Sequence, residues 1–404
     1  MTQPLTEAQI EALRAATPGC QRVIHFNHSG ASLPSQATIT AMIEQMNREA
    51  IQGPMEAAAQ GEVLLENARK TAARLINCTP SSLAFLSSGS AAWGMAFSAL
   101  RAWRRGDRIL VGRHEWGGNL ACMAQALAAG ASLEVIPCDE NGAVSVPALE
   151  AMIDERVRLI SLTWLPANGG LINPAAAIGA VAKRHNIPYF IDAGQALGQI
   201  SVDVQAMGCD VLKGACRKFL RGPRGTALLY IREGFVERLQ PPFVDVLSAP
   251  RLGENFTPRD DARRFETSEM SMALIAGLNN ALSEVEVLGV ARVRQRIQQL
   301  ALSLRQRMTE VVGLKLQDCG AATDQSGLVS FTLEGWDAVE IKQQLAAQGI
   351  NIGANGVAYT PLDMQARGLV NIARISVSYL NTDVEIDTLL LALREMSRAR
   401  KSAV

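Results

Sequence analysis

The hydrophobic pattern of the chain alternates between short apolar runs and longer segments with helical spacing. From about residue 80 to 230 the apolar runs have the length of buried strands, and they cover residues 83–86, 109–111, 133–136, 159–162, 187–191 and 209–212. Segments with helical character separate several of them, for example residues 146–153 and 174–185. This alternation predicts an α/β fold with a mostly parallel sheet that helices cover on both faces.

The pattern changes on either side of this region. Residues 6–16 predict a short helix that begins at Thr6, and residues 57–77 predict an amphipathic helix. Residues 270–311 have the spacing of one long helical region with a break at Gly289, and strands are expected at 328–333, 350–352 and 372–377. We therefore predict an N-terminal arm over residues 1–24, a large domain over 25–270, and a smaller α+β domain over 271–404 that includes the long connecting helix.

Composition and charge exclude several classes of protein. Hydrophobic residues make up 48% of the chain and charged residues 19%, which is typical of a soluble enzyme. Lys+Arg and Asp+Glu both number 39, so no basic excess indicates a nucleic-acid or membrane partner. We find no signal peptide and no apolar run of membrane-spanning length. The seven cysteines lack metal-ligand spacing, which predicts reduced thiols in a cytoplasmic protein without a metal site.

The strongest chemical signal comes from two consecutive strand ends. Asp192 ends one buried strand, and Lys218 follows the next one in a turn that also contains Arg217, Arg221 and Arg224. The summed charge of three arginines is predicted to lower the pKa of the lysine and so to free its amine as a nucleophile. The same arginines suit a phosphate group. An acid, a reactive amine and a phosphate-binding set fit pyridoxal phosphate, which lysine binds as a Schiff base while an aspartate holds the pyridinium nitrogen.

At these residues the chain resembles the class V branch of the fold-type I pyridoxal phosphate enzymes. This branch contains cysteine desulfurases, isopenicillin N epimerase-like proteins and carbon-sulfur lyases. Residues 192–195 (DAGQ) match the Asp-x-x-Gln motif, and residues 217–218 with 222–225 (GPRG) match the lysine loop, 26 residues after Asp192. The resemblance implies a fold-type I transferase with a mostly parallel sheet of the seven-stranded type in its large domain and a smaller α+β C-terminal domain.

Further cofactor contacts follow from the motifs and the resemblance together. Gly89 and Ser90 open a helix after strand 83–86, where free backbone N–H groups favour an anion such as a phosphate. The resemblance places Trp116 where an aromatic residue stacks on the cofactor ring, and Asn168 beside the position of a contact to the phenolic oxygen. The predicted catalytic residue is Lys218, and the predicted cofactor-binding residues are Gly89, Ser90, Trp116, Asn168, Asp192, Gln195, Arg217 and Lys218.

Substrate binding is predicted at four other residues. Arg374 lies inside a β-branched run, where a buried guanidinium is costly without a partner. A substrate carboxylate provides that partner through a bidentate pair, and the resemblance assigns this role to Arg374. Asn27 and His28 belong to a segment that the resemblance places at the border of the substrate cavity, and Tyr359 lies on the loop before Arg374. We therefore expect an amino-acid substrate.

The resemblance leaves the reaction open among several types. Desulfurases carry a cysteine on the loop before the arginine, and Ala358 stands at that position, which disfavours a persulfide relay. The leading hypothesis is an α,β-eliminating lyase that acts on an S-substituted cysteine, with Lys218 as the acid/base for the α-proton. The alternatives are an epimerase or an aminotransferase; epimerisation needs a second acid/base, for which His28, His114 or Tyr359 are available. A non-catalytic pyridoxal phosphate binder is a further alternative, and no helix-turn-helix is recognised that would support a regulator.

The resemblance also implies a homodimer. Residues 261–266 (DARRFE) are similar to an Arg-Phe-Glu element that lies near the cofactor of the neighbouring subunit in the family. Glu269 replaces the threonine that desulfurases place three residues after this glutamate. We therefore expect a homodimer without a phosphate contact from residue 269 of the partner.

Overall fold

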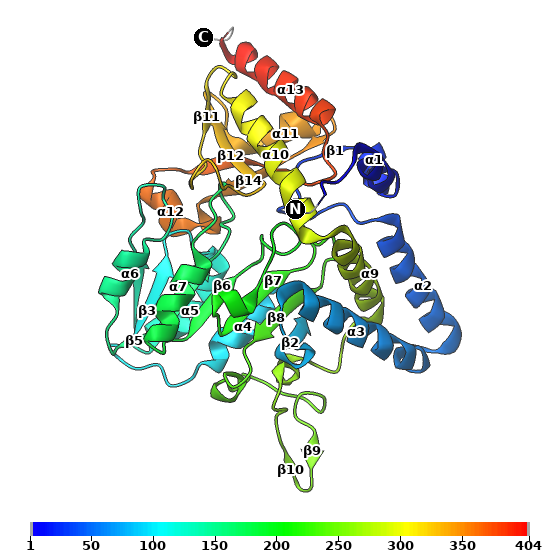
Figure 1. The fold of residues 1–404 in the computed structure, drawn as a ribbon, viewed down its shortest axis with the longest axis vertical. Helices are drawn as coiled ribbons and strands as arrows, with labels where there is room; N and C mark the ends of the chain where they lie inside the picture. The colour runs from blue at the N-terminus through cyan, green and yellow to red at the C-terminus, as the bar shows by residue number, and fades with distance from the viewer. Residues whose placement is uncertain (1–2, 402–404) are drawn as a thin grey trace.

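The computed structural model describes residues 3–401, and a seven-stranded sheet forms the centre of its larger part (Figure 1). The strand order is β2-β8-β7-β6-β5-β3-β4, and all strands run parallel except β8, which is antiparallel to both neighbours. The strands are β2 (Leu83–Leu86), β3 (Arg108–Gly112), β4 (Ser132–Ile136), β5 (Val157–Thr163), β6 (Tyr189–Asp192), β7 (Val211–Ala215) and β8 (Ala227–Ile231). The predicted fold class is confirmed.

Helices cover both faces of this sheet, because successive residues of a strand point to opposite sides. Leu110 of β3 packs in one apolar cluster with Leu149 and Ile178 on one face, while its neighbour Ile109 packs with Trp93 on the other. The helices and short 3-10 turns of this region are α4 (Gly89–Ala99), α5 (Gly117–Ala128), α6 (Val146–Met152), α7 (Ala175–Arg184), α8 (Val204–Met207), η2 (Pro80–Ser82), η3 (Val236–Arg238) and η4 (Ala262–Phe265). Strands β6, β7 and β8 are buried throughout, which explains why their sequences are apolar apart from Asp192 and Lys213.

The remaining helices before the C-terminal sheet are the short α1 and four longer helices. They are α1 (Glu7–Ala15), with Thr6 as its N-cap, α2 (Gln36–Gln52), α3 (Pro54–Ile76), α9 (Met272–Leu288) and α10 (Val290–Met308). The predicted break at Gly289 is confirmed, since α9 and α10 meet there at 78° and Gly289 has a φ of +78°. Among the described residues no single helix is long and apolar enough to cross a membrane, and only this bent pair passes that test.

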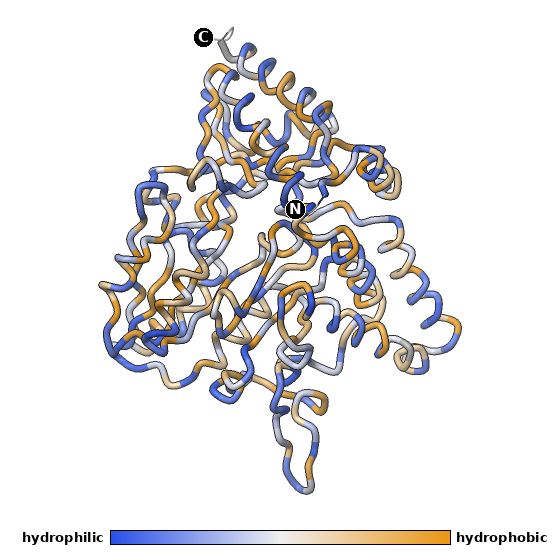
Figure 2. The backbone as a smooth tube through the Cα atoms, in the orientation of Figure 1, coloured by the Kyte–Doolittle hydropathy of each residue, from blue (hydrophilic) through white to orange (hydrophobic). Residues whose placement is uncertain are grey.

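A four-stranded antiparallel sheet forms the core of the C-terminal part. Its order is β11-β12-β15-β14, with β11 (Leu314–Leu316), β12 (Leu328–Leu333), β14 (Gly353–Gly356) and β15 (Asn371–Ser376). The helices around it are α11 (Ala338–Ala346), η5 (Val357–Tyr359), α12 (Pro361–Ala366) and α13 (Asp383–Lys401). Along α13, hydrophilic and hydrophobic positions alternate turn by turn (Figure 2), and Ile386, Leu389, Leu390 and Leu393 are buried at helical spacing.

The N-terminal segment joins this smaller sheet region. After α1 and the turn η1 (Pro18–Gln21), β1 (Ile24–His25) pairs in parallel with β13 (Ile350–Asn351), and Phe26 lies in the apolar core of the C-terminal part. A hairpin of β9 (Arg251–Leu252) and β10 (Asn255–Phe256) projects away from the body (Figure 1). The domain boundaries at residues 25 and 271 stay predictions, because packing and strand pairing continue across both.

Candidate active site

A cavity of about 290 Å³ lies at the carboxyl ends of β6 and β7, where open α/β sheets bind their ligands. Lys218 reaches it from the turn after β7. Burial first, and then the charges of Lys213, Arg217 and Arg374, lower the pKa of Lys218 far below its ordinary value, although Asp192 opposes the shift. The predicted cofactor residues that line the cavity are Gly89, Ser90, Trp116, Asp192, Gln195, Arg217 and Lys218.

One end of the cavity is built to bind an anion. Helix α4 begins there, because the Ser88 side chain accepts a hydrogen bond from Ala91 N (3.1 Å), and Gly89 and Ser90 face the cavity in its first turn. Arg217 and Arg224 line the same space, and Arg217 Nε is buried without a hydrogen-bond partner. Unpaired N–H groups and arginines together fit a phosphate group.

Arg221 does not belong to this cluster, and its predicted role is corrected. Its guanidinium points to the opposite side, where it donates hydrogen bonds to Thr17 Oγ1 (2.6 Å), Tyr379 Oη (2.8 Å) and Leu33 O (2.8 Å). The residue has a φ of +61°, so the backbone turns at this position and carries the side chain away from Lys218. Arg221 therefore holds the N-terminal segment against the turn, and sequence proximity to Lys218 was misleading.

Asp192 lines the same cavity, next to Lys213. Asp192 Oδ1 accepts a hydrogen bond from Gly194 N (2.8 Å), while Oδ2 accepts one from Asn119 Nδ2 (3.0 Å) and lies 2.7 Å from Lys213 Nζ. Burial raises the pKa of Asp192, but the charge and hydrogen bond of Lys213, the charge of Lys218 and the Gly194 N–H together lower it overall. Asp192 is therefore held as a carboxylate, as a partner for a pyridinium nitrogen must be.

Lys213 and Glu115 are polar residues of this site that sequence reasoning missed. Lys213 lines the cavity from β7. In the sequence, a lysine inside an apolar strand was the feature that could have identified it as a site residue. Glu115 lies behind Trp116 and accepts hydrogen bonds from Thr163 Oγ1 (2.6 Å) and Ser161 Oγ (2.7 Å). Burial raises the pKa of Glu115. Asn119 Nδ2 bridges Glu115 (2.8 Å) and Asp192 (3.0 Å), so the two carboxyl groups form one buried network.

Asn168 and His28 make other contacts in the structure, and their predicted roles stay predictions. Asn168 is not among the residues that line the cavity, where Ala167 stands instead; its Nδ2 donates to Thr360 Oγ1 (2.8 Å). His28 is 1% exposed, packs edge-on against His25, and has Ser32 Oγ 3.0 Å from its Nδ1. Both side chains are buried, and His28 Nε2 has no hydrogen-bond partner among the described residues. Gln195, in contrast, lines the cavity, and its Oε1 is buried there without a hydrogen-bond partner.

Arg374 does not itself line the cavity, but its Nη1 donates a hydrogen bond to the backbone oxygen of Ala167 (2.7 Å), which does. Arg374 is 4% exposed, its Nε has no hydrogen-bond partner, and among the described residues no carboxylate forms an ion pair with it. Burial lowers the pKa of Arg374 to about 10. A β-carbon on Gly353 would lie 3.3 Å from both Arg374 Nε and Asn27 Oδ1, so Asn27 is a close neighbour. Tyr359 packs edge-on against Trp116 with 5.4 Å between ring centroids, near the charge of Arg374.

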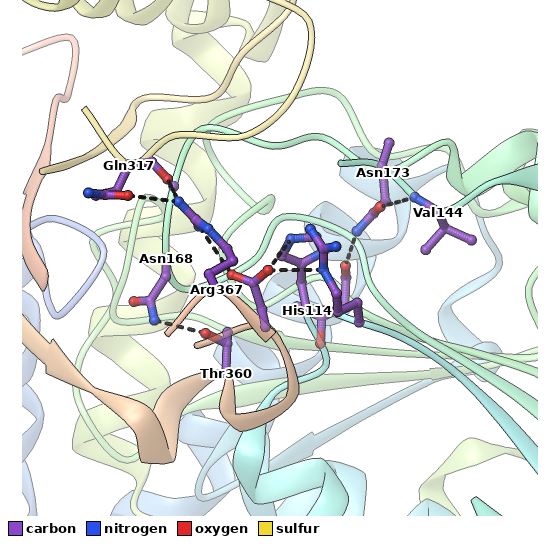
Figure 3. Close-up of polar contacts among 12 residues, drawn as sticks. His114, Val144, Asn168, Asn173, Gln317, Thr360 and Arg367 are labelled. Atoms are coloured by element: carbon purple, nitrogen blue, oxygen red, sulfur yellow. Dashed lines mark hydrogen bonds and ion pairs between the residues drawn. The ribbon is translucent and has the colours of Figure 1, made fainter. Parts of the chain in front are cut away.

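The loop that carries Tyr359 is anchored to the large sheet region. Asn168 holds Thr360, and Asp363 lies 3.1 Å from both Arg113 Nε and His114 Nε2 (Figure 3). The loop also approaches α5 so closely that a β-carbon on Gly117 would lie 2.0 Å from Ala358 O. His114, a predicted alternative acid/base, is therefore used to anchor α12.

Comparison with known proteins decides the family. The family model for class-V aminotransferases matches residues 24–389. The chain belongs to the class-V aminotransferase family. This class-V enzyme uses pyridoxal 5'-phosphate, and the residues present fit that group: an unpaired amine, an anion site, a held carboxylate and an aromatic side chain line one cavity.

Curated relatives and solved structures agree with this class-V assignment. A "Probable cysteine desulfurase" from Xylella fastidiosa strain 9a5c is 27% identical over 412 residues, which cover 98% of this chain and 97% of the relative. The apo structure of a cysteine desulfurase from Thermococcus onnurineus NA1 has a TM-score of 0.89 at 22% identity and covers 96% of this chain and 98% of that one. The complex of a cystine C-S lyase with cysteine persulfide has a TM-score of 0.84 at 23% identity, with 94% and 99% covered.

The predicted dimer element of this class-V enzyme has a role within its own chain. Glu266 is buried and forms a bidentate pair with Arg69, at 2.8 Å to NH1 and 3.1 Å to NH2. Its Oε1 also accepts a hydrogen bond from Phe85 N (2.8 Å) at β2. The homodimer itself stays a prediction.

Proposed function

We propose that this enzyme is an α,β-eliminating carbon-sulfur lyase that acts on an S-substituted cysteine. The observation that carries the proposal is the loop of residues 353–367. It contacts Trp116 at the cavity through Tyr359, has Ala358 where the resemblance places the cysteine of a desulfurase, and is anchored through Thr360 and Asp363. A loop without a thiol has no nucleophile that could accept sulfur, so the leaving group must depart as a thiol.

The cysteines of the chain support this conclusion. All seven lie in the described part of the chain, and none lines the cavity. Cys216, which is the nearest in sequence to Lys218, is fully buried, and burial raises the pKa of its thiol to about 12. A thiol with so high a pKa is a poor nucleophile at neutral pH.

The names of the relatives support a cysteine-type substrate. One relative is described as a probable cysteine desulfurase, and one similar structure is of a cystine C-S lyase bound to cysteine persulfide. Both names describe cleavage of a carbon-sulfur bond in a cysteine derivative. We therefore place the substrate of this chain in the same chemical class.

Each residue of the site has a role in this proposal. Bound pyridoxal phosphate supplies an electron sink for bonds at the substrate's α-carbon. Arg374 pairs with the substrate carboxylate, and Trp116 covers the face of the cofactor ring. Lys218, whose pKa burial lowers far below its ordinary value, accepts the α-proton. The Cβ–S electron pair leaves with sulfur, which takes up the proton that Lys218 accepted and departs as a thiol. The remaining enamine tautomerises to an imine, and water hydrolyses it to a keto acid and ammonia.

The epimerase alternative depends on a second acid/base. Of the three residues considered for it, His28 is buried away from the cavity and His114 is held by Asp363. Tyr359 is 38% exposed and is the one that stays next to Trp116. Of these residues, only Tyr359 is left as the second acid/base that epimerisation requires. Transamination, the other alternative, requires return of the α-proton to the cofactor instead of loss of sulfur.

Product analysis in heavy water tests the proposal. The purified enzyme is incubated with S-substituted cysteines and with plain amino acids, and products are identified by mass spectrometry and chiral chromatography. Keto acid, ammonia and a free thiol in equal amounts are expected, with Lys218→Ala as the inactive control. An intact amino acid with deuterium at Cα and mixed chirality, abolished by Tyr359→Phe, would replace the lyase by the epimerase.

A further inference from the structure

Lys213 is a second lysine in the cofactor cavity. It lies in β7, where every residue is buried, and its side chain is 7% exposed. Its Nζ lies 2.7 Å from Asp192 Oδ2, and Asp192 is its one ion-pair partner within residues 3–401. Lys213 and Asp192 both line the cavity. Their ion pair is therefore part of the site and not a salt bridge in a remote part of the fold.

The two lysines converge on the same place. A β-carbon on Gly194 would lie 3.6 Å from Lys218 Nζ, 3.7 Å from Lys213 Nζ and 2.9 Å from Asp192 Oδ1. A β-carbon on Gly89 at the anion end would lie 3.5 Å from Lys213 Nζ. Two amines and one carboxylate thus share a small space that any side chain at residue 194 would fill.

We propose that Lys213 is a positioning residue that shares the Asp192 carboxylate with the cofactor's ring nitrogen and keeps Lys218 free of its proton. The carboxylate has few free lone pairs, because Oδ1 takes the Gly194 N–H and Oδ2 takes Asn119 and Lys213. The fixed ammonium of Lys213 therefore competes with a protonated ring nitrogen for Asp192. The same charge disfavours a second cation at Lys218, because like charges repel strongly away from water.

Other ionisable groups around this pair are accounted for. Cys122 on α5 is close enough to feel the charge of Lys213, and Glu115 is coupled to Asp192 through Asn119. The groups that influence Lys218 are Lys213, Asp192, Arg217 and Arg374. The inference rests on the cofactor and not on the proposed substrate, so an enzyme without lyase activity leaves it intact.

The test is a pH titration of the holoenzyme's visible absorbance, which reports protonation of the lysine-bound cofactor. Removal of one nearby positive charge in Lys213→Met is expected to raise the midpoint by about one to two pH units, the effect of a unit charge at a site of intermediate dielectric. Lys213→Arg keeps the charge and is expected to titrate like the wild type. Lys183→Met, which removes an exposed lysine on α7, controls for lysine loss in general.

Two further measurements make the result decisive. Lys213→Gln removes the charge but keeps a hydrogen-bond donor for Asp192, and the same upward shift is expected if Lys213→Met does not fold. An unchanged midpoint in a folded neutral variant overturns the proposal. If both neutral variants fail to fold while Lys213→Arg folds, the proposal is also overturned, because the charge then serves folding alone. Borohydride reduction and peptide mapping must place the cofactor on Lys218; a cofactor on Lys213 overturns the assignment of the two roles.

Discussion

Asn168 Nδ2 donates a 2.8 Å hydrogen bond to Thr360 Oγ1 and so joins the turn after β5 to the loop before α12. Both residues are buried, and 192 positions separate them in sequence. Together with the contacts of Asp363 to Arg113 and His114, this bond anchors the loop at two points (Figure 3). The loop is thereby held against the large sheet region, where Tyr359 contacts Trp116 of the cavity.

Thr360→Val is expected to loosen this loop. The buried amide of Asn168 loses its acceptor, which costs about 1–3 kcal/mol of the free energy of unfolding. Urea unfolding measures the loss, and limited proteolysis within residues 353–367 is expected to become faster. Thr360→Ser keeps the hydroxyl and is the control. Wild-type stability and cleavage rate in the valine variant would show that the bond does not hold the loop.

Arg374→Met is expected to lower kcat/KM for an amino-acid substrate. Truncating one partner of a buried charge pair costs about 2–5 kcal/mol, or roughly thirty-fold to several thousand-fold. The effect should vanish with a substrate analogue that lacks the α-carboxylate, because the variant removes only the group that pairs with it. Arg158→Met, on a more exposed arginine of β5, is the control. An equal loss with both substrates would point to disruption of the fold instead.

The pH dependence of cofactor binding should report the lowered pKa of Lys218. The neutral amine is the form that reacts, so the rate of recombination with pyridoxal phosphate is expected to stay constant above this pKa and to fall tenfold per pH unit below it. Stopped-flow absorbance between about pH 6 and 10 covers the range up to the ordinary lysine value of about 10.4. A midpoint near that ordinary value would mean that the cavity does not lower the pKa of Lys218.

Arg69→Met is expected to destabilise the fold by about 3–5 kcal/mol, because it leaves the buried carboxylate of Glu266 without its partner. The double variant Arg69→Met with Glu266→Gln should recover part of this loss, since the amide oxygen still accepts from Phe85 N without a buried charge. Arg74→Met breaks an exposed pair with Glu286 and should cost less than about 1 kcal/mol. Urea unfolding compares all three; equal losses for Arg69→Met and Arg74→Met would refute the burial argument.

The sequence by itself determined the fold class and the centre of the site. Continuous apolar runs such as 187–191 indicate strands buried on both faces, and the spacing of Asp192 and Lys218 places them at the ends of two strands that turned out to be neighbours. These features are local: periodicity selects the element, and parallel pairing brings strand ends together. Gly89, Trp116, Asp192 and Lys218 accordingly line one cavity.

Only the tertiary structure decided which of the charged side chains face the cavity. Arg221 follows Lys218 closely in sequence, yet a positive φ turns it toward Thr17 and Tyr379. Lys213 lies inside β7, ahead of the turn that carries Lys218, and its buried ammonium contacts Asp192. Side-chain direction depends on local backbone angles and on partners hundreds of residues away, and neither is encoded in spacing along the chain. The amino-acid sequence therefore determines where the chemistry lies, and packing determines which residues perform it.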